Sequence, residues 1–266
     1  MKIDFHTHGK LAKYLPFSPV YTDWLFERAK ASGLDALCLT EHFNTTEFDK
    51  VYRYIRDNST MCNDALIYKN GLKIFAGMET DVAEGGHILS IGRMEDILML
   101  NSILEPHKTK ETFLPFHELM ALFAQYDVIV GNAHPFREGG HVPECDMADL
   151  EKLFFVDLNG KDVACNREKT EEEVFAYAKK LGKPVVGGSD THQALQYGCI
   201  MNDFREDIDT IDGLRKAMLE GGYTIEIDER ARDKVEAAAL LKKCLKKIDA
   251  LGGDYVTMLV ENTSIV

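Results

Sequence analysis

The chain begins with Met1-Lys2-Ile3-Asp4-Phe5-His6-Thr7-His8, in which two histidines follow a short apolar run. In an extended strand, residues two apart point to the same face, so His6 and His8 present two imidazoles to one side. Taken alone, an H-x-H pattern is a weak indication of a metal site. Its meaning depends on the residues that adjoin the other apolar runs of the chain.

The same arrangement, in which ligand-type residues adjoin an apolar run, recurs along the sequence. It is seen at Thr40-Glu41-His42, Gly77-Met78-Glu79, Gly86-His87, Ala133-His134-Pro135 and Ser189-Asp190-Thr191-His192. Six of the nine histidines thus lie at the ends or beginnings of strand-like runs. A separate structural role for each histidine would not explain why their positions share this pattern. Neutral imidazole suits zinc, manganese or iron, and carboxylates suit the harder of these ions. The combined pattern predicts a metal site.

Strand-like runs alternate with helix-like segments. The runs cover residues 3–5, 36–39, 74–78, 88–91, 128–130, 153–158, 185–186 and 223–227, and helices are expected at 23–32, 115–126, 170–181 and 229–251. This alternation predicts an α/β fold with a mainly parallel sheet. Ligand-type residues adjoin nearly every run and do not gather at one switch point, so a closed barrel is favoured over an open sheet.

The composition is that of an acidic chain with enough apolar residues for one large core. Of its 266 residues 45% are hydrophobic, and the formal net charge is −13. Proteins that wrap a nucleic-acid duplex usually carry a basic stripe. The one lysine cluster is interpreted as a solvated helix face; it comprises Lys242, Lys243, Lys246 and Lys247. We therefore expect a small anionic substrate and no bulk nucleic-acid binding.

The cysteines and the N-terminus bear on the cellular location. None of the six cysteines forms a C-x-x-C pair, so they are interpreted as reduced thiols. The first strand-like run begins at residue 3, and no apolar run approaches the ~18 residues needed to cross a bilayer. These features predict a cytoplasmic protein with no membrane partner, and they give no indication of its oligomeric state.

In their order and local wording, the motifs resemble those of the polymerase-and-histidinol-phosphatase (PHP) superfamily. The resemblance extends from Met1 to Tyr197 and includes D-F-H-T-H, T-E-H, G-M-E, A-H-P and G-S-D-T-H. It implies a distorted (β/α)7-type TIM-like barrel, here a single domain over residues 1–266 with the helix 229–251 packed on it. It also implies a metal-dependent phosphoesterase.

The resemblance further implies which residues hold the two or three divalent ions (Zn, Mn or Fe). The first ion would be held by His6, His8, Glu79 and Asp190, the second by Glu79, His87 and His134, and the third by His42 and His192. The family pattern supplies the third ion with another ligand a few residues after H-x-H. Residues 9–15 contain no His, Asp or Glu, so Glu41 or water would have to complete that position.

The implied reaction is hydrolysis of a small phosphomonoester or phosphodiester by a metal-bridging hydroxide. Expected catalytic residues are Glu79, Asp190, His192 and His42; the last two are alternatives for assisting the leaving group. Arg137 and Lys10 are candidates for binding the substrate phosphate, since each closely follows a proposed ligand. Asp157 and Asn159 are expected to support the ligands.

Two other functional classes remain open. An amidohydrolase also uses H-x-H on a barrel, but it expects a bridging lysine where this chain has Glu79. A catalytically silent metal-binding module would show loss of the ligand residues, and only the ligand expected within residues 9–15 is missing.

Overall fold

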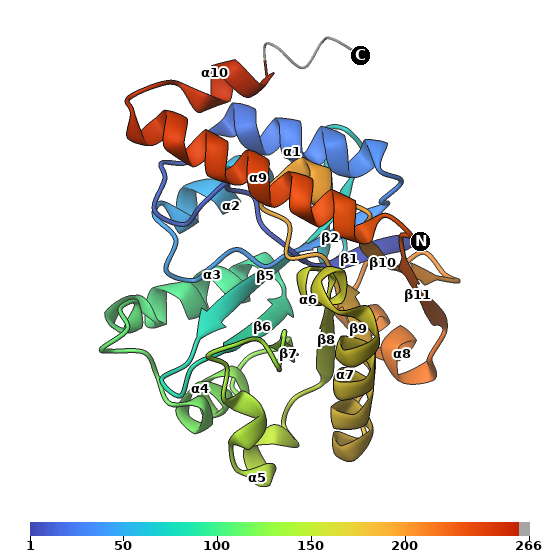
Figure 1. The fold of residues 1–266 in the computed structure, drawn as a ribbon. Coiled ribbons are helices and arrows are strands. Elements are labelled where there is room, and N and C mark those ends of the chain that lie inside the picture. Colours follow the sequence, from blue (N-terminus) through green and yellow to red (C-terminus); the bar gives the residue numbers. More distant parts are fainter. Residues whose placement is uncertain (261–266) are drawn as a thin grey trace.

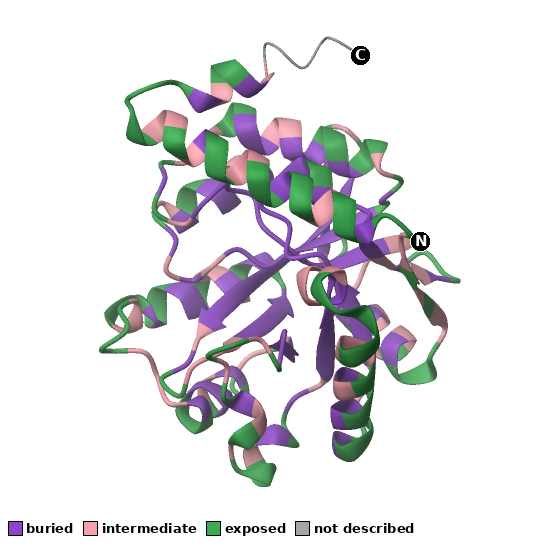
Figure 2. Ribbon diagram, viewed as in Figure 1, coloured by how far each residue is buried: buried purple, intermediate pink, exposed green. Residues whose placement is uncertain are grey.

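One sheet of eleven strands carries the fold, and helices lie around its outside (Figure 1). The computed structural model describes residues 1–260; the last six residues of the predicted domain lie outside the described part. The barrel strands are almost entirely buried, whereas most helices turn one buried side inward and one exposed side outward (Figure 2). The burial pattern is that of a sheet enclosed by a helical layer.

Seven strands form the path of the barrel. In spatial order they are β1 (Lys2–Thr7), β2 (Ala36–Leu39), β5 (Lys73–Asp81), β6 (His87–Gly92), β7 (Val128–Ala133), β8 (Phe155–Asn159) and β9 (Val185–Gly188). The pairs β1–β2, β2–β5, β7–β8 and β8–β9 are parallel. Only β6 runs antiparallel to both of its neighbours on this path. This antiparallel strand is where the barrel departs from a regular parallel one.

Four further strands extend the sheet beyond the barrel path. β10 (Ile200–Phe204) pairs antiparallel with β1, and β11 (Tyr223–Ile227) pairs with β10. The hairpin of β3 (Ser59–Cys62) and β4 (Ala65–Tyr68) attaches to β5. The apolar runs of the sequence predicted β11 but missed β3 and β4, which have four residues each, and β10, which contains the adjacent polar residues Asn202 and Asp203.

The barrel closes between β9 and β1 through backbone and side-chain hydrogen bonds. Just beyond β9, the Asp190 amide donates to the His6 carbonyl at 2.7 Å, and the His8 amide donates to the Thr191 carbonyl at 2.9 Å. The buried Asn202 accepts from the Gly187 amide at 2.8 Å and donates to the carbonyls of Gly187 and Ile3. The nearly closed sheet confirms the predicted distorted TIM-like barrel.

Ten α-helices and three short 3₁₀ turns occur within residues 1–260. The helices are α1 (Pro19–Ala31), α2 (Phe48–Asp57), α3 (Met94–Ile103), α4 (Phe116–Phe123), α5 (Met147–Leu150), α6 (Gly160–Cys165), α7 (Arg167–Leu181), α8 (Ile211–Glu220), α9 (Ala231–Ala250) and α10 (Tyr255–Val260). The 3₁₀ turns are η1 (Glu105–His107), η2 (Val142–Glu144) and η3 (Ala194–Gln196). Helix α9 lies within two residues of the predicted 229–251.

The start of α7 differs from the prediction. The sequence predicted a helix that begins at residue 170, but Asn166 is the N-cap and accepts from the Lys169 amide. The Thr170 hydroxyl donates to the Asn166 carbonyl, four residues earlier, and to the Asp162 carbonyl in α6, so Thr170 already lies within the helix. The predicted end is confirmed, because Gly182 adopts a φ of 66° as the C-cap.

An apolar layer fills the inside of the sheet next to the polar rim. It contains Phe5, Phe75, Leu89 and Phe155, and side chains of α8 such as Leu214 join it. A second, larger apolar cluster lies between the strands and the outer helices. The interior is therefore packed with side chains, and the polar residues at its rim are held on a rigid base.

Closure of the barrel depends on the amide group of Asn202. In Asn202→Leu, the buried Gly187 and Ile3 backbone groups lose their partners, so we expect the free energy of unfolding to fall by about 2–4 kcal/mol. Urea denaturation followed by circular dichroism measures this. Asp203→Ala, at the next position with a side chain 41% exposed, is the control and is expected to change stability little. Equal stability of the two variants would contradict the closing role.

Candidate metal centre

Glu79, near the end of β5, lies at the centre of a cluster of imidazoles. Its carboxylate is 1% exposed, and five histidines place a ring nitrogen within 3.4 Å of one of its oxygens. The nearest approaches are 2.7 Å to His87 Nδ1 and 2.9 Å to His42 Nδ1. The other three are His6, His8 and His134.

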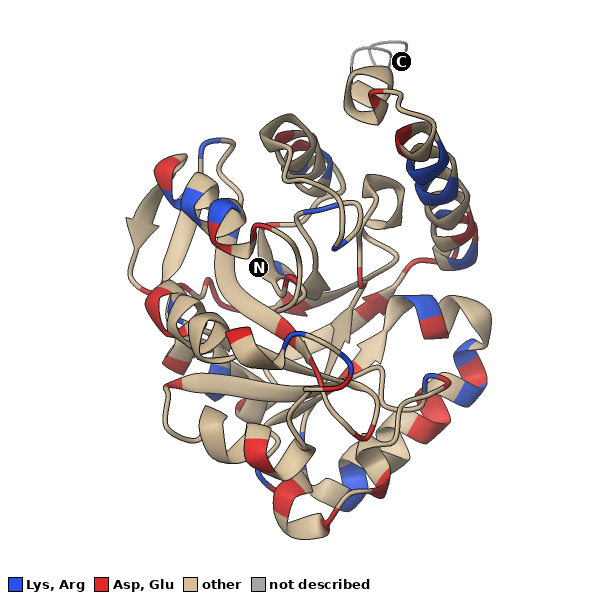
Figure 3. Ribbon diagram, turned by 90° about the vertical axis from the view of Figure 1, so that its left-hand side faces the viewer, with Lys and Arg blue, Asp and Glu red and all other residues tan. Residues whose placement is uncertain are grey.

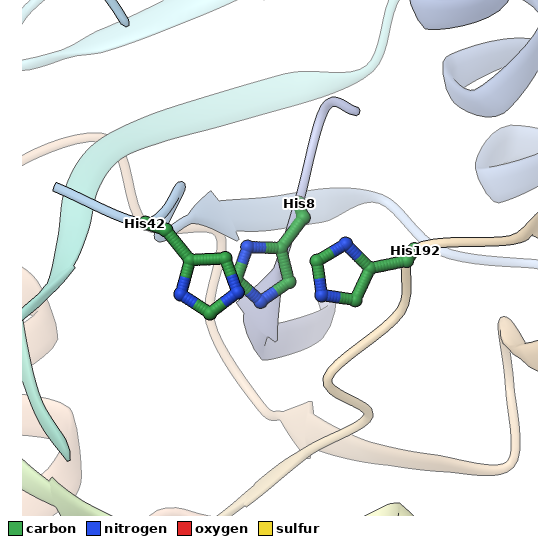
Figure 4. A group of neighbouring side chains, drawn as sticks. All are labelled: His8, His42 and His192. Atoms are coloured by element: carbon green, nitrogen blue, oxygen red, sulfur yellow. The ribbon is translucent and has the colours of Figure 1, made fainter. Parts of the chain in front are cut away.

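The cluster divides into groups whose ligand atoms lie within 4.8 Å of one another. They are His6, His8 and Asp190; Glu79, His87 and His134; and His8, His42 and His192. All eight residues predicted as ligands are therefore brought together. His8 belongs to two groups, which the sequence did not indicate. In Figure 4 its ring lies between those of His42 and His192, with centroids 4.5 and 3.9 Å away.

The strand directions explain why these side chains meet at one rim. His8 directly follows β1, and Glu79 lies two residues before the end of β5, which runs in the same direction. Asp190 comes two residues after β9. His87 is the first residue of β6, but β6 runs antiparallel and pairs His87 with both Asp81 and Ala133. A residue at the beginning of this strand thus reaches the same rim as residues at the ends of the others.

Two of the predicted ligands have backbone conformations that are uncommon for residues other than glycine. His134 has a φ of 30° and Asp190 a φ of 56°. Positive φ values in non-glycine residues are costly, and they tend to occur where the surroundings fix a functional side chain. His134 directly follows β7 and Asp190 comes two residues after β9, so in both places the turn after the strand redirects the side chain toward the cluster.

A second set of polar groups orients the imidazoles. Asp157 Oδ2 lies 3.1 Å from His6 Nδ1, and it also accepts from the His134 amide and from the Asn159 side chain. His192 Nδ1 lies 3.0 Å from the Lys10 carbonyl. A carbonyl can only accept, so Nδ1 carries the proton and Nε2 remains free to bind.

Several buried polar atoms of the cluster make no hydrogen bond of normal geometry, although His42 Nδ1 and Glu79 Oε2 approach to 2.9 Å. They are Glu79 Oε2 and the ring nitrogens His6 Nε2, His8 Nδ1, His8 Nε2 and His42 Nδ1. Buried polar groups are normally satisfied, so a concentration of orphaned lone pairs needs an explanation. Nitrogen and carboxylate donors that face one another at this spacing fit divalent cations.

The electrostatics of the cluster ionise its two carboxylates and keep His192 neutral. Against the effect of burial, nearby carboxylates raise the pKa of His6, His8 and His87, so a bound cation would displace protons from these three rings. Burial by itself would raise the pKa of Glu79, but His87 and His42 hold it well below its usual value. Burial likewise acts against ionisation of Asp190, and Lys161 lowers its pKa well below normal. Burial lowers the pKa of His192 far below its usual value, and neighbouring His8 adds to this. The two carboxylates are thus charged and His192 neutral near pH 7.

The two predicted phosphate-binding residues differ in where they lie. Arg137 reaches the cluster, and its Nη1 donates to Asp190 Oδ2 at 2.9 Å while Nε and Nη2 bond to Asp162 and Asn159. The buried Lys10 turns its ammonium to the Thr46 carbonyl and hydroxyl. The geometry of Lys10 therefore does not support the predicted contact with substrate, whereas Arg137 is hydrogen-bonded to the proposed ligand Asp190.

Lys161 is a site residue that the sequence reasoning missed. Its Nζ lies 2.8 Å from Asp190 Oδ1, the oxygen that also approaches His8 Nε2 to 3.4 Å. A signal was present, because Lys161 follows the apolar run 153–158 much as the predicted ligands follow theirs. Asp81 was also missed; its Oδ1 lies 3.1 Å from His87 Nε2 and orients that ring.

Comparison with known proteins identifies the family to which this fold and cluster correspond. A model of the PHP domain family matches residues 4–230. The chain belongs to the PHP domain family. No curated protein matches it in sequence. The match ends at residue 230, directly before α9. Helix α9 therefore lies outside the residues matched by the family model.

Solved structures share the fold at low sequence identity. PsfC from Pseudomonas syringae PB-5123 is 20% identical, with a TM-score of 0.75 over 92% of this chain and 98% of PsfC. Endonuclease Q in complex with a 27-mer duplex substrate containing an abasic lesion is 18% identical, with a TM-score of 0.62 over 85% of this chain. A two-domain Bacteroides vulgatus protein containing a predicted PHP-like metal-dependent phosphoesterase is 17% identical, with a TM-score of 0.57 over 86% of this chain.

This chain spans only part of the length of two of these proteins, namely 58% of Endonuclease Q and 65% of the Bacteroides protein. The Endonuclease Q complex also corrects our expectation about partners. A small substrate and no nucleic acid were predicted from the acidic charge, and this exclusion is wrong, because a duplex is a substrate on the same fold. Net charge is a poor guide when the local charge at a site differs from it.

Within residues 1–260, no helix is both long and apolar enough to serve as a membrane span. All six cysteines are free.

Gly188 allows β9 to approach the cluster closely. A Cβ at this position would lie 2.4 Å from His6 Cβ and 2.6 Å from Asp157 Oδ1. We therefore expect Gly188→Ala to lower the free energy of unfolding by about 1–3 kcal/mol and to reduce the bound metal, measured by urea denaturation and elemental analysis. Gly222→Ala is the control, since a Cβ there meets nothing within 4 Å. Normal metal content in Gly188→Ala would show that His6 need not hold its position.

Proposed function

We propose that this PHP domain hydrolyses a phosphate ester with two or three divalent ions held by the cluster around Glu79. The observation that carries the proposal is the set of orphaned lone pairs, on Glu79 and on three histidines, buried at one rim of the barrel. Family membership supports it, because the motifs resemble those of metal-dependent phosphoesterases.

The three groups of the cluster are the proposed ion positions. The first ion is assigned to His6, His8 and Asp190, the second to Glu79, His87 and His134, and the third to His8, His42 and His192. Glu79 also lies 3.4 Å from His6 and His8, so it is suited to bridge the first two positions. The mixture of imidazole and carboxylate ligands favours Zn, Mn or Fe.

Divalent ions at these positions would supply a water of lowered pKa and neutralise charge on the phosphoryl group. The chain's own residues hold and orient them. Asp157 fixes the His6 ring, and Arg137 anchors Asp190 while keeping one Nη1 hydrogen for a substrate oxygen. His192 has its proton on Nδ1, so we assign assistance of the leaving group to His42, which is 14% exposed, in the enzyme whose third ion position is empty.

The other two classes receive less support. An amidohydrolase would require a lysine that bridges the two ions, and this chain has Glu79 in that position. Lys161 does not take the bridging place, because it contacts Asp190 at one side of the cluster. Loss of ligands, which would mark a silent module, is not seen among the eight clustered residues. Phosphate-ester hydrolysis is therefore the function favoured by the site.

The experiment that tests the proposal is a hydrolysis screen of purified protein with a measured metal content. The panel should contain phosphomonoesters, phosphodiesters, nucleotides, and duplexes with and without an abasic site, because both ester classes and nucleic acid stay open. Release of phosphate or cleavage that disappears on chelation and returns with Zn, Mn or Fe is expected. Fully loaded protein that hydrolyses no member of the panel would refute the proposal.

Replacing Glu79 by Gln should abolish hydrolysis and lower the metal content. An amide is a poor bridge between two cations, whereas the rim position of Glu79 leaves the packed core intact, so folding should persist. Activity, elemental analysis and thermal melting are measured together. Glu95→Gln in the first turn of α3, far from the cluster, is the matched control. Full activity and normal metal loading in Glu79→Gln would rule out the bridging role.

The metal count depends on how the ligands are shared. The third position has only imidazoles, and one of them, His8, also serves the first position. We therefore expect about two ions to survive prolonged dialysis, with the third lost first. Elemental analysis of dialysed wild type and His42→Ala tests this, since the variant should retain the same two ions. Three ions in dialysed wild type would mean that Glu41 or another group completes the third position.

A further inference from the structure

Helix α9 lies beside the cluster although it falls outside the family match. It begins at Ala231, directly after the matched residues 4–230. Helix α9 contacts α6, which carries Lys161 (Figure 1), and it also contacts η3, which begins two residues after His192. Side chains on the packed face of α9 are therefore placed next to the His192 side of the cluster.

Lys242 is on that packed face. Its neighbours at four residues before and three after, Ala238 and Leu245, are 1% and 3% exposed, and residues so spaced share one side of a helix. Lys243 and Lys247 are exposed. Basic residues are indeed prominent on α9 (Figure 3). The interpretation of all four lysines as a solvated face is thus wrong for Lys242.

The ammonium of Lys242 has no counter-ion in the part of the chain that the structure describes. No hydrogen bond or ion pair involves it within residues 1–260, whereas Lys246, one turn further, lies 5.1 Å from the Tyr14 ring centroid. Burial, together with the positive charge of Lys161, lowers the pKa of Lys242 to about 8, against the opposing effect of Asp190. A partly desolvated cation without an anion is unfavourable unless a ligand supplies the charge.

Lys161 brings a second cation to the same side. Its ammonium forms an ion pair with Asp190 Oδ1, which lies 3.8 Å from His192 Nε2. An ion bound at the first position would use Asp190 as well, and would compete with Lys161 for that carboxylate. Two ammonium groups, one from α6 and one from α9, are then on the same side of the cluster, and within residues 1–260 only that of Lys161 has a carboxylate in ion-pair contact.

We propose that Lys161 and Lys242 bind the phosphate group of the substrate, and that α9 is consequently a substrate-recognition element of this chain. The inference rests on the proposed function and extends it to the substrate class. Two cations in addition to the bound ions favour a terminal phosphate with two negative charges over a phosphodiester with one. The scissile group is accordingly a phosphomonoester, whether on a small molecule or on a nucleic-acid end.

Binding of inorganic phosphate tests the site without requiring turnover. Isothermal titration calorimetry would compare metal-loaded wild type, Lys242→Met, Lys242→Arg and Lys243→Met, each with its metal content measured. Lys242→Met keeps the aliphatic stem and should weaken phosphate binding about tenfold or more. Lys242→Arg should retain most of the affinity, and Lys243→Met, which removes an exposed charge from the same helix, should equal wild type.

The outcomes separate this inference from the proposed function. Phosphate binding that depends on Lys242 supports the inference even if no ester is hydrolysed, in which case the proposed function fails alone. Phosphate binding by Lys242→Met equal to that of Lys243→Met, or none by wild type, would overturn the inference even in an active enzyme. If Lys242→Met melts at a lower temperature than wild type, the phosphate affinity of Lys242→Arg decides the question. Loss of phosphate binding in Lys242→Arg at normal stability would also contradict the inference.

The substrate class is tested by steady-state kinetics if the enzyme is active. Lys242→Met should raise KM for a phosphomonoester more than KM for a phosphodiester. Equal increases for the two esters would overturn the proposed substrate class.

Discussion

A carboxylate that is buried at the rim of a barrel, as Glu79 is, must be compensated by positive charge or by hydrogen bonds. Here five imidazoles surround it, yet one of its oxygens keeps no hydrogen-bond partner. Much of the surrounding structure acts to hold these rings in place. Asp157 orients His6, Asp81 orients His87, and the Lys10 carbonyl orients His192. The arrangement is unfavourable without cations and favourable with them, which is why we regard it as a metal centre.

The site could be predicted from sequence to the extent that each ligand adjoins a buried strand. H-x-H, the carboxylate after Gly77-Met78 and the histidines at strand ends were all identified because strand termini meet at one rim in a barrel. His87 was identified for a less regular reason, since it begins an antiparallel strand. The sequence pattern shows that a histidine adjoins an apolar run but not which way the run points.

The remaining features depend on tertiary packing that no local pattern reports. β10 alternates buried and partly buried residues, and its Asn202 is a barrel-closing group only because Gly187 lies opposite. The side of α9 that Lys242 occupies is decided by contact with α6 and η3. Global charge was the least informative feature, because a net charge of −13 coexists with Lys161 and Arg137 at the site. Reasoning from it led to the incorrect exclusion of nucleic acid.

The antiparallel course of β6 also bears on how the centre is assembled during folding. β5, β6 and β7 form a meander of consecutive antiparallel pairings, and this segment alone contributes Glu79, His87 and His134. The other main group needs His6 and Asp190, which lie almost two hundred residues apart and meet only when β9 reaches β1. Contacts of low sequence separation form with a smaller loss of chain entropy than distant ones. One half of the centre is therefore locally encoded, and the other half is completed only by the long-range contact that shuts the barrel.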